Sequence, residues 1–173
     1  MPVKELITVP DDILRRKSEP LNKVDVNEKK LIKDLFETMY HHNGIGLAAV
    51  QVGILKRVVV LDVSKNENDK KPLCFINPQI KTLSEKMSTY EEGCLSIPGM
   101  QGLVRRFKKI KYSGFDLDGK EIENEVEGLH ARVVQHEVDH LNGILYTSRL
   151  AHKNAFGFEK EITTYWKNEQ NRK

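Results

Sequence analysis

The sequence predicts an α+β fold in which antiparallel strands pack around a central helix, with a long helix near the N-terminus and another helix at the C-terminus. Apolar residues recur at helical spacing early in the chain and again after residue 128. Between these stretches, β-branched and alternating segments predict strands. One helix, several strands and then a second helix are typical of an α+β domain.

The first long helix is predicted over Asn27–His42. Its apolar residues repeat every three or four positions, as one face of an amphipathic helix requires: Leu31, Ile32, Leu35, Phe36, Met39 and Tyr40. We expect Asn27 to cap the N-terminus of this helix and Asn43-Gly44 to end it. The helix therefore leads into a loop that contains glycine.

Strands are predicted in the middle of the chain. Arg57–Val63 and Leu73–Asn77 are rich in β-branched and apolar residues. Val104–Asp116 and Glu121–Glu127 flank the pair Asp118-Gly119, which is typical of hairpin turns. These two segments are therefore expected to form an antiparallel hairpin.

Helical spacing returns over Leu129–Asn142, which is the predicted central helix. Leu129, Val133, His136 and His140 follow one another at intervals of four, three and four residues, so they are expected to form one stripe. Apolar side chains would then lead up to the two histidines.

The tail from Ser148 is predicted to form the last helix, because its apolar residues Phe158, Ile162, Tyr165 and Trp166 have amphipathic spacing. A chain of 173 residues can bury a core without disulfides, and the most polar stretch, Ser64–Lys71, predicts a loop rather than a linker. We therefore expect a single domain over residues 1–173, with the C-terminal helix at 148–173.

Charge and hydropathy narrow the function classes. The formal net charge is +3, with 28 basic and 25 acidic residues interspersed, so a nucleic-acid substrate is not expected. The first 14 residues lack the continuous apolar core of a signal peptide, and no stretch of about 18 apolar residues occurs. We expect a cytoplasmic protein that does not interact with membranes.

The chain has two cysteines with different surroundings. Cys74 lies in an apolar run that predicts a buried strand, where a free thiol acts as a small hydrophobe. Cys94 lies in Glu92-Gly93-Cys94-Leu95-Ser96-Ile97-Pro98, where glycine and proline predict a tightly specified backbone. In a reducing cytosol an isolated functional cysteine is more often a metal ligand than part of a disulfide.

The segment His136-Glu137-Val138-Asp139-His140 predicts a metal site on the central helix. Residues four apart lie on one helix face, so His136 and His140 can bind one ion while Glu137 reaches its open side. With Cys94 the site has three ligands, and three protein ligands with a vacant fourth position are typical of catalytic rather than structural sites.

A third segment, Gly44-Ile45-Gly46-Leu47-Ala48-Ala49-Val50-Gln51, is small and apolar until it ends in one amide. Small residues let backbone lie close to an extended peptide, and Gln51 can donate a hydrogen bond to an oxyanion. Taken alone, the segment is more typical of a tight turn that leaves Gln51 on the surface.

Together and in this order, GIGLAAVQ, EGCLS and HEVDH resemble the three signature segments of the peptide deformylases. The resemblance extends from about Ile7 to Leu150 and is closer to the shorter, bacterial-type branch. It implies a metal-dependent hydrolase that removes the formyl group from the N-terminal formylmethionine of newly made proteins and releases formate. The expected partners are therefore N-formylmethionyl nascent peptides.

The resemblance also implies residue roles. Cys94, His136 and His140 match the metal ligands and Glu137 the general acid/base. Gln51 and the backbone N–H of Leu95 match the oxyanion donors. The remaining matches concern the substrate-binding residues Ile45, Gly46, Gly93 and Tyr90, and the supporting pair Glu92 and Arg106. Helix geometry turns Asp139 away from the ion, so a supporting role is expected for it as well, with surface pairing as the alternative for Arg106 and Asp139.

Periodicity adds Leu129 and Val133 as candidates for a methionine pocket, although the same spacing is equally typical of core residues. Near Gln101 many relatives place an arginine that holds the main chain of the substrate. The uncharged residue here departs from that family pattern.

One divalent ion per chain is expected. A thiolate with two imidazoles suits zinc, iron, cobalt or nickel, and the resemblance implies Fe²⁺ natively, with Zn²⁺, Ni²⁺ or Co²⁺ in purified protein.

Two alternatives remain at this stage. A zinc peptidase uses the same two-histidine helix, although a glutamate or histidine is its usual third ligand. A binding module with a structural metal would use the basic C-terminal helix, with Lys160, Lys167, Arg172 and Lys173, to dock to the ribosome. Such docking is also compatible with enzyme activity.

Overall fold

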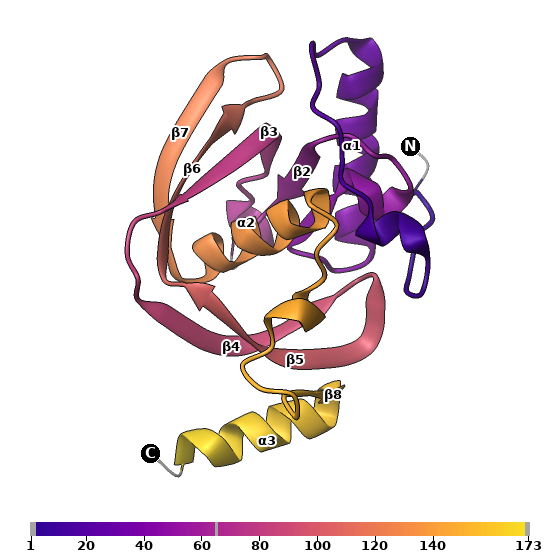
Figure 1. Cartoon of the computed structure of the whole chain (residues 1–173). Helices are drawn as coiled ribbons and strands as arrows, with labels where there is room; N and C mark the ends of the chain where they lie inside the picture. The colour runs from indigo at the N-terminus through magenta and orange to yellow at the C-terminus, as the bar shows by residue number, and fades with distance from the viewer. Residues whose placement is uncertain (1–2, 65, 172–173) are drawn as a thin grey trace.

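The computed structural model describes residues 3–64 and 66–171 and folds into two antiparallel sheets with helices between and around them (Figure 1). The larger sheet has the strand order β1-β2-β3-β6-β7, formed by Gly46–Ala48, Val58–Leu61, Leu73–Thr82, Lys109–Phe115 and Glu121–Glu127. The smaller sheet has the order β4-β5-β8, formed by Met87–Cys94, Ile97–Phe107 and Phe156–Phe158. The α-helices are α1 (Val26–His41), α2 (Gly128–Leu141) and α3 (Glu159–Asn171), and short 3₁₀ turns span Asp12–Arg15, Ala49–Val52, Glu67–Asp69 and Tyr146–Arg149.

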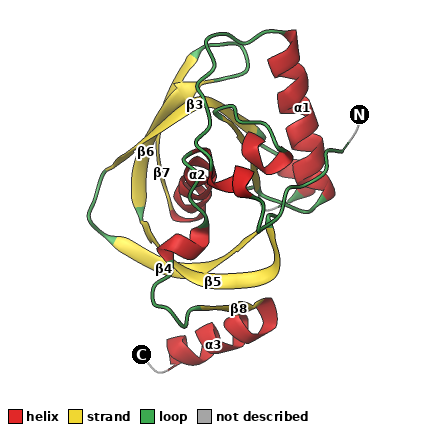
Figure 2. Cartoon of the chain, turned by 45° about the vertical axis from the view of Figure 1, so that its right-hand side comes forward, coloured by secondary structure: helices red, strands yellow, loops and turns green. Residues whose placement is uncertain are grey.

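Helix α2 lies in the middle of the molecule, enclosed by strands of both sheets (Figures 1 and 2). Its apolar residues Ala131, Val134, Val138 and Leu141 are buried in one cluster with residues of β2, β3 and β6. A helix packed on most sides can carry polar groups only where other polar groups meet them. The α+β prediction with a central helix is confirmed.

Helix α1 packs on β1 and β2 and begins with a capping box. The side chain of Asp25 accepts hydrogen bonds from the backbone N–H groups of Asn27 and Glu28, and the Glu28 carboxylate accepts one from the N–H of Asp25. The predicted helix is confirmed to within one residue at each end, but the expected cap at Asn27 is wrong. Asp25 is the cap because the backbone N–H groups of Asn27 and Glu28 are both within reach of its side chain.

The predicted strands are partly confirmed. Strand β2 is shorter than expected and β3 longer, and β6 and β7 form the predicted hairpin. The run Val104–Asp116 is not one strand, however: it divides at Lys108 between β5 and β6, which belong to different sheets. Strand β4 was not predicted, because its sequence Met87–Cys94 is largely polar.

The predicted C-terminal helix begins later than expected. Residues 156–158 form β8, which pairs with Met100–Gly102 of β5, and only then does α3 start at Glu159. The backbone of Leu103 is also hydrogen-bonded to Ala151 and Ala155, so the chain forms a turn and then a strand where a helix was predicted. Ile162 and Trp166 do lie on the buried face of α3, as their spacing predicted.

Cys74 lies on β3 as expected and is largely buried among apolar residues on the α1 side of the sheet. Burial raises the pKa of its thiol to about 12, so it stays protonated at neutral pH.

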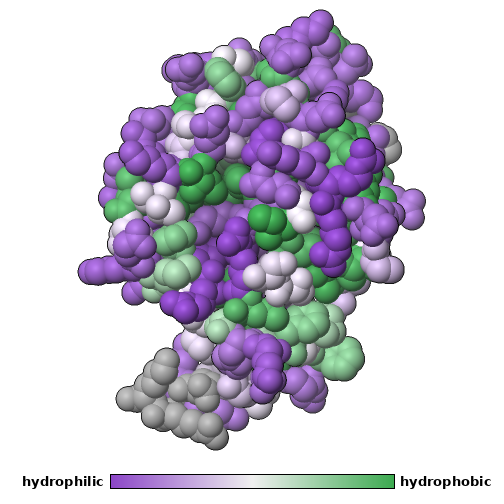
Figure 3. Space-filling model, in the orientation of Figure 1, coloured by the Kyte–Doolittle hydropathy of each residue, from purple (hydrophilic) through white to green (hydrophobic). Residues whose placement is uncertain are grey.

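Polar side chains cover most of the face seen in Figure 3, with apolar side chains gathered between the body and the C-terminal helix. Within residues 3–64 and 66–171, none of the helices combines the length and the apolar character that crossing a membrane would require.

We predict that Asp25→Ala lowers the free energy of unfolding by about 1 kcal/mol, because two N–H groups at the start of α1 lose their acceptor. Urea unfolding measures the difference. Asn27→Ala is the matched control and should change stability by much less, since Asn27 is already inside the helix. An equal loss in both variants would contradict the assignment of the cap.

Candidate metal centre

Three side chains that can bind a metal ion meet between α2 and the end of β4. The Sγ atom of Cys94 lies 3.2 Å from Nε2 of His140, which in turn lies 3.2 Å from Nε2 of His136. One potential ligand atom from each residue lies within 4.8 Å of the other two. The structure thus brings together the three ligands that the sequence suggested.

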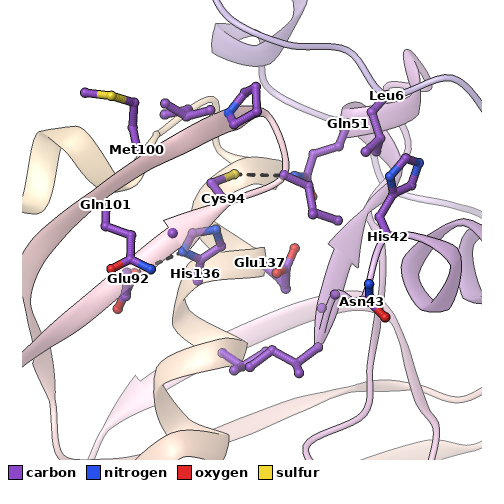
Figure 4. A pocket seen from close by; sticks show the side chains of 18 of the residues that line it. Leu6, His42, Asn43, Gln51, Glu92, Cys94, Met100, Gln101, His136 and Glu137 are labelled. Atoms are coloured by element: carbon purple, nitrogen blue, oxygen red, sulfur yellow. Dashed lines mark hydrogen bonds and ion pairs between the residues drawn. The ribbon is translucent and has the colours of Figure 1, made fainter. Parts of the chain in front are cut away.

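Two local structures produce this arrangement. His136 and His140 are one turn apart on α2, so their rings lie on the same face. Cys94 ends β4, where Leu95 and Ser96 form a two-residue turn and Ile97 pairs back with Cys94. The turn presents the thiol at the edge of the sheet that faces the histidines (Figure 4).

The donor atoms and their spacing fit a divalent metal ion. In a tetrahedral site with ordinary metal–sulfur and metal–nitrogen bonds, ligand atoms are separated by roughly 3.3–3.6 Å, close to the separations of 3.2 Å found here. Burial lowers the pKa of His140, so this ring is neutral, as a ligand must be. Burial also acts to lower the pKa of His136, but contacts with Cys94 and Glu92 raise it, so an ion has to displace a proton there.

A buried carboxylate orients the His136 ring. Nδ1 of His136 lies 3.0 Å from Oε2 of Glu92, which leaves Nε2 directed at the other two ligands (Figure 4). Arg106 of β5 holds the same carboxylate with two hydrogen bonds of 2.7 and 2.9 Å. Burial acts to raise the pKa of Glu92, but the bonds from His136 and Arg106 lower it well below its ordinary value, so the carboxylate stays charged.

Arg106 also connects this carboxylate to α2. Its Nη1 donates to Asp139 at 2.7 Å, and Arg149 donates to the other oxygen of Asp139, also at 2.7 Å. Glu92, Arg106 and Asp139 therefore lie in one buried ion network, which is compatible with the supporting role expected for all three from the sequence.

Glu137 is buried beside the ligands and lines the same cavity as His136. Its Oε2 has no hydrogen-bond partner among the described residues. Burial raises the pKa of Glu137 to about 7, although the charges of His136 and Arg106 act to lower it. A carboxyl group with such a pKa can both accept and donate a proton near neutral pH.

Gln51 is buried next to the thiol rather than exposed on a turn. Its Oε1 accepts from the N–H of Ala48 at 2.9 Å, and this directs Nε2 towards Oγ of Ser96 at 3.2 Å and Sγ of Cys94 at 3.5 Å (Figure 4). The N–H groups of the Gln51 amide therefore point towards the candidate metal centre.

The centre opens into a cavity of about 1110 Å³. Two of the ligands, Cys94 and His136, line it. The other predicted site residues that line it are Ile45, Gly46, Gln51, Glu92, Gly93, Leu95, Leu129, Val133 and Glu137. The N-terminal segment forms a further wall: Ile7 N–H donates to Gln51 O at 2.8 Å and Val9 N–H to Ser96 O at 2.9 Å. This segment ties the Gln51 turn to the turn that follows Cys94.

Tyr90 is not among the residues that line the cavity. Its ring is more than half exposed, and it packs on Trp166 of α3 and beside the guanidinium of Arg132. These contacts turn it away from the metal centre, so the structure gives no support to Tyr90 as a substrate-binding residue. Gln101 does line the cavity, and its buried Oε1 has no hydrogen-bond partner in the part of the chain that the structure describes.

Three residues of the site were not predicted from the sequence: Ser96, Arg132 and Arg149. Ser96 shares the amide of Gln51, and the two arginines complete the ion network. Of these three residues, Arg132 alone could have been recognised from the sequence. It lies one turn before His136 on the predicted central helix, and a charged residue on a buried helix has to be paired.

Comparison with known proteins gives the same assignment. The family model described as polypeptide deformylase matches residues 3–156. The chain belongs to the peptide deformylase family. A peptide deformylase of Rhizobium meliloti is 49% identical over 146 residues, with 84% of each chain covered, and that of Maricaulis maris is 42% identical over 165 residues, with 94% of this chain and 95% of the relative covered.

Solved peptide deformylase structures have the same fold. That of Ehrlichia chaffeensis superposes with a TM-score of 0.82 at 37% identity and covers 97% of both chains. A structure of the enzyme from the same organism in complex with actinonin has a TM-score of 0.83 at 38% identity, covering 98% of this chain and 99% of that one. Peptide deformylases are metal-dependent enzymes that remove the formyl group from N-terminal formylmethionine. This decides between the alternatives in favour of the deformylase and against the zinc peptidase and the binding module.

We predict that Gly46→Ala lowers kcat/KM for a formylated peptide at least tenfold with little change in melting temperature. A Cβ at this position would lie 2.9 Å from Cδ of Glu137, so the carboxyl group would have to move. Gly157→Ala is the control, because a Cβ there meets only Ile162, at ordinary contact distances from 3.5 Å. Unchanged kcat/KM in Gly46→Ala would mean that the position of Glu137 does not limit the reaction.

Proposed function

We propose that this chain removes the formyl group from N-formylmethionyl peptides at the centre formed by Cys94, His136 and His140, with Glu137 as general acid/base. The observation that carries the proposal is the meeting of these three ligand atoms beside a buried carboxyl group that has a free oxygen and faces the cavity. The overall reaction is hydrolysis of an amide to formate and a free amine.

The role of Glu137 follows from its burial. Cys94, His136 and His140 would hold a divalent ion, whose Lewis acidity would make hydroxide available near neutral pH. Glu137 accepts the proton that water loses and then delivers it to the leaving nitrogen, as its pKa of about 7 allows in both directions.

Gln51 and Leu95 are proposed to hold the charge that develops on the formyl oxygen. The amide of Gln51 is fixed by Ala48 with Nε2 towards Cys94, and Leu95 follows Cys94 in the turn, which places its backbone N–H next to the same ligand. Losing one such donor typically costs about 3 kcal/mol of transition-state stabilisation.

Two kinds of cavity wall are proposed to bind the substrate, one formed by backbone and one by apolar side chains. The backbone at Ile45, Gly46 and Gly93 would pair with the extended peptide, and Leu129 and Val133 would contact the methionine side chain. Gln101 offers an uncharged amide in the same cavity.

The native ion is proposed to be Fe²⁺, with Zn²⁺, Ni²⁺ or Co²⁺ able to replace it. The thiolate and two imidazoles support any of these ions, and the family resemblance favours iron. A reducing cytosol, where Cys94 stays a thiol, is the proposed location.

We predict that anaerobically purified, Fe²⁺-loaded protein releases formate from a formyl-Met-Ala-Ser peptide. Glu137→Gln should lower kcat at least a hundredfold while the ion stays bound, because the proton acceptor is lost but no ligand is changed. Cys94→Ala should lose the ion as well as the activity. Measuring bound metal beside formate separates the two roles, and activity retained in Glu137→Gln would refute the assigned base.

We predict that Val133→Asp raises KM for a formylmethionyl peptide more than for a formylalanyl peptide. A carboxylate at this buried position would weaken binding of the apolar methionine side chain more than binding of the smaller methyl group of alanine. Steady-state kinetics on the two peptides measures the difference, and equal effects on both would remove Val133 from the methionine pocket.

Docking to the ribosome through the C-terminal helix is a further proposal. Lys160 and Lys167 are exposed on the described part of α3, and Arg172 and Lys173 lie outside the described residues. We predict that replacing both exposed lysines by glutamate abolishes co-pelleting with ribosomes at low salt while formate release is unchanged. Unchanged pelleting would dismiss the docking.

A further inference from the structure

The guanidinium of Arg132 is buried among polar groups of the smaller sheet. It donates to Oε1 of Glu92 at 2.6 Å and to the carbonyl oxygen of Val104 at 3.1 Å. Its other terminal nitrogen donates to O and Oγ of Ser88 at 3.0 and 3.1 Å. Arg132 therefore connects α2 to both β4 and β5.

The carboxylate of Glu92 receives donors on every side. Oε1 accepts from Arg106 and Arg132, and Oε2 accepts from Arg106 and faces Nδ1 of His136. Arg132 and His136 are four residues apart on α2, so two successive turns of the helix hold the same carboxylate. Glu92 is two residues before Cys94 on β4, so its carboxylate joins the strand that carries the thiol to the helix that carries the imidazoles.

The ion network also shows that Arg132 is not needed to neutralise a buried charge. Two carboxylates, Glu92 and Asp139, meet three guanidiniums, those of Arg106, Arg132 and Arg149. Without Arg132 each carboxylate still has an arginine partner. Replacing it is therefore expected to leave a folded protein, and the specific contribution of Arg132 is the direction in which it holds Glu92.

We propose that Arg132 is a positioning residue of the metal centre, which fixes the Glu92 carboxylate between β4 and α2 and so keeps the His136 ring aimed at the ion. The inference rests on the proposed function, since it assumes that His136 is a ligand. Groups that orient a ligand typically change metal affinity by about 10–100-fold when they are removed.

The test compares Arg132→Met with Arg132→Lys in Co²⁺-loaded protein. Methionine keeps the length and apolar stem but removes every donor, whereas lysine keeps the charge and one contact to Glu92. The rate of Co²⁺ release into excess chelator, the visible absorption of bound Co²⁺, and kcat and KM for formate release are measured. Arg105→Met is the matched control, because Arg105 is exposed on the same strand as Arg106. Ile32→Val, a buried change on the distant α1, is the control for lowered stability alone.

We expect Arg132→Met to release Co²⁺ about tenfold faster or more, with a changed Co²⁺ spectrum and a kcat that falls more than KM rises. Arg132→Lys should restore part of each value, and both controls should keep the wild-type release rate and spectrum. A folded Arg132→Met that releases Co²⁺ at the wild-type rate would overturn the proposal, and so would equally fast release from Ile32→Val.

Failure of the proposed function has a different signature. Wild-type protein that binds Co²⁺ but releases no formate would contradict the proposed function alone, because the release rates still decide the role of Arg132. Wild-type protein that binds no Co²⁺ would contradict both.

Discussion

The carboxylate of Glu92, buried between Arg106 and His136, is the interaction on which the rest of the site depends. A charged carboxylate inside a protein is stable only when donors surround it, and here every donor comes from a different strand or helix than Glu92 itself. Satisfying this one charge therefore fixes β4, β5 and α2 relative to each other. The distance between the thiol of Cys94 and the two imidazoles is a consequence of that constraint.

The position of α2 inside the fold explains the chemistry of the site. Strands of both sheets enclose the helix, so His140 and Glu137 are removed from water, and burial moves their pKa values in the directions that a neutral ligand and a proton carrier need. Gly46 lies against Glu137, and the N-terminal segment bonds to both Gln51 and Ser96. The long-range contacts that build the core thus also hold the groups proposed to act on the substrate.

Much of this could be predicted from local sequence, and what was missed has a physical reason. The helix around His136 and the helix at residues 26–41 have clear apolar periods, so both were found almost to the residue. Strand β4 was missed because its inward side chains are polar and belong to the ion network. Arg132 was missed because its partner Glu92 is 40 residues away in sequence. Arg149 was missed because it meets Asp139 only through the way the chain turns back after α2, and the start of α3 was misplaced because pairing with β5 overrides helical spacing at residues 156–158.

The most direct test of the central claim is X-ray absorption at the metal edge of the Co²⁺-loaded protein. The account predicts one sulfur at about 2.3 Å and two imidazole nitrogens at about 2.1 Å, with the sulfur lost in Cys94→Ala. A spectrum with only oxygen and nitrogen ligands in the wild-type protein would contradict it, because the ion would then lie elsewhere than between Cys94, His136 and His140.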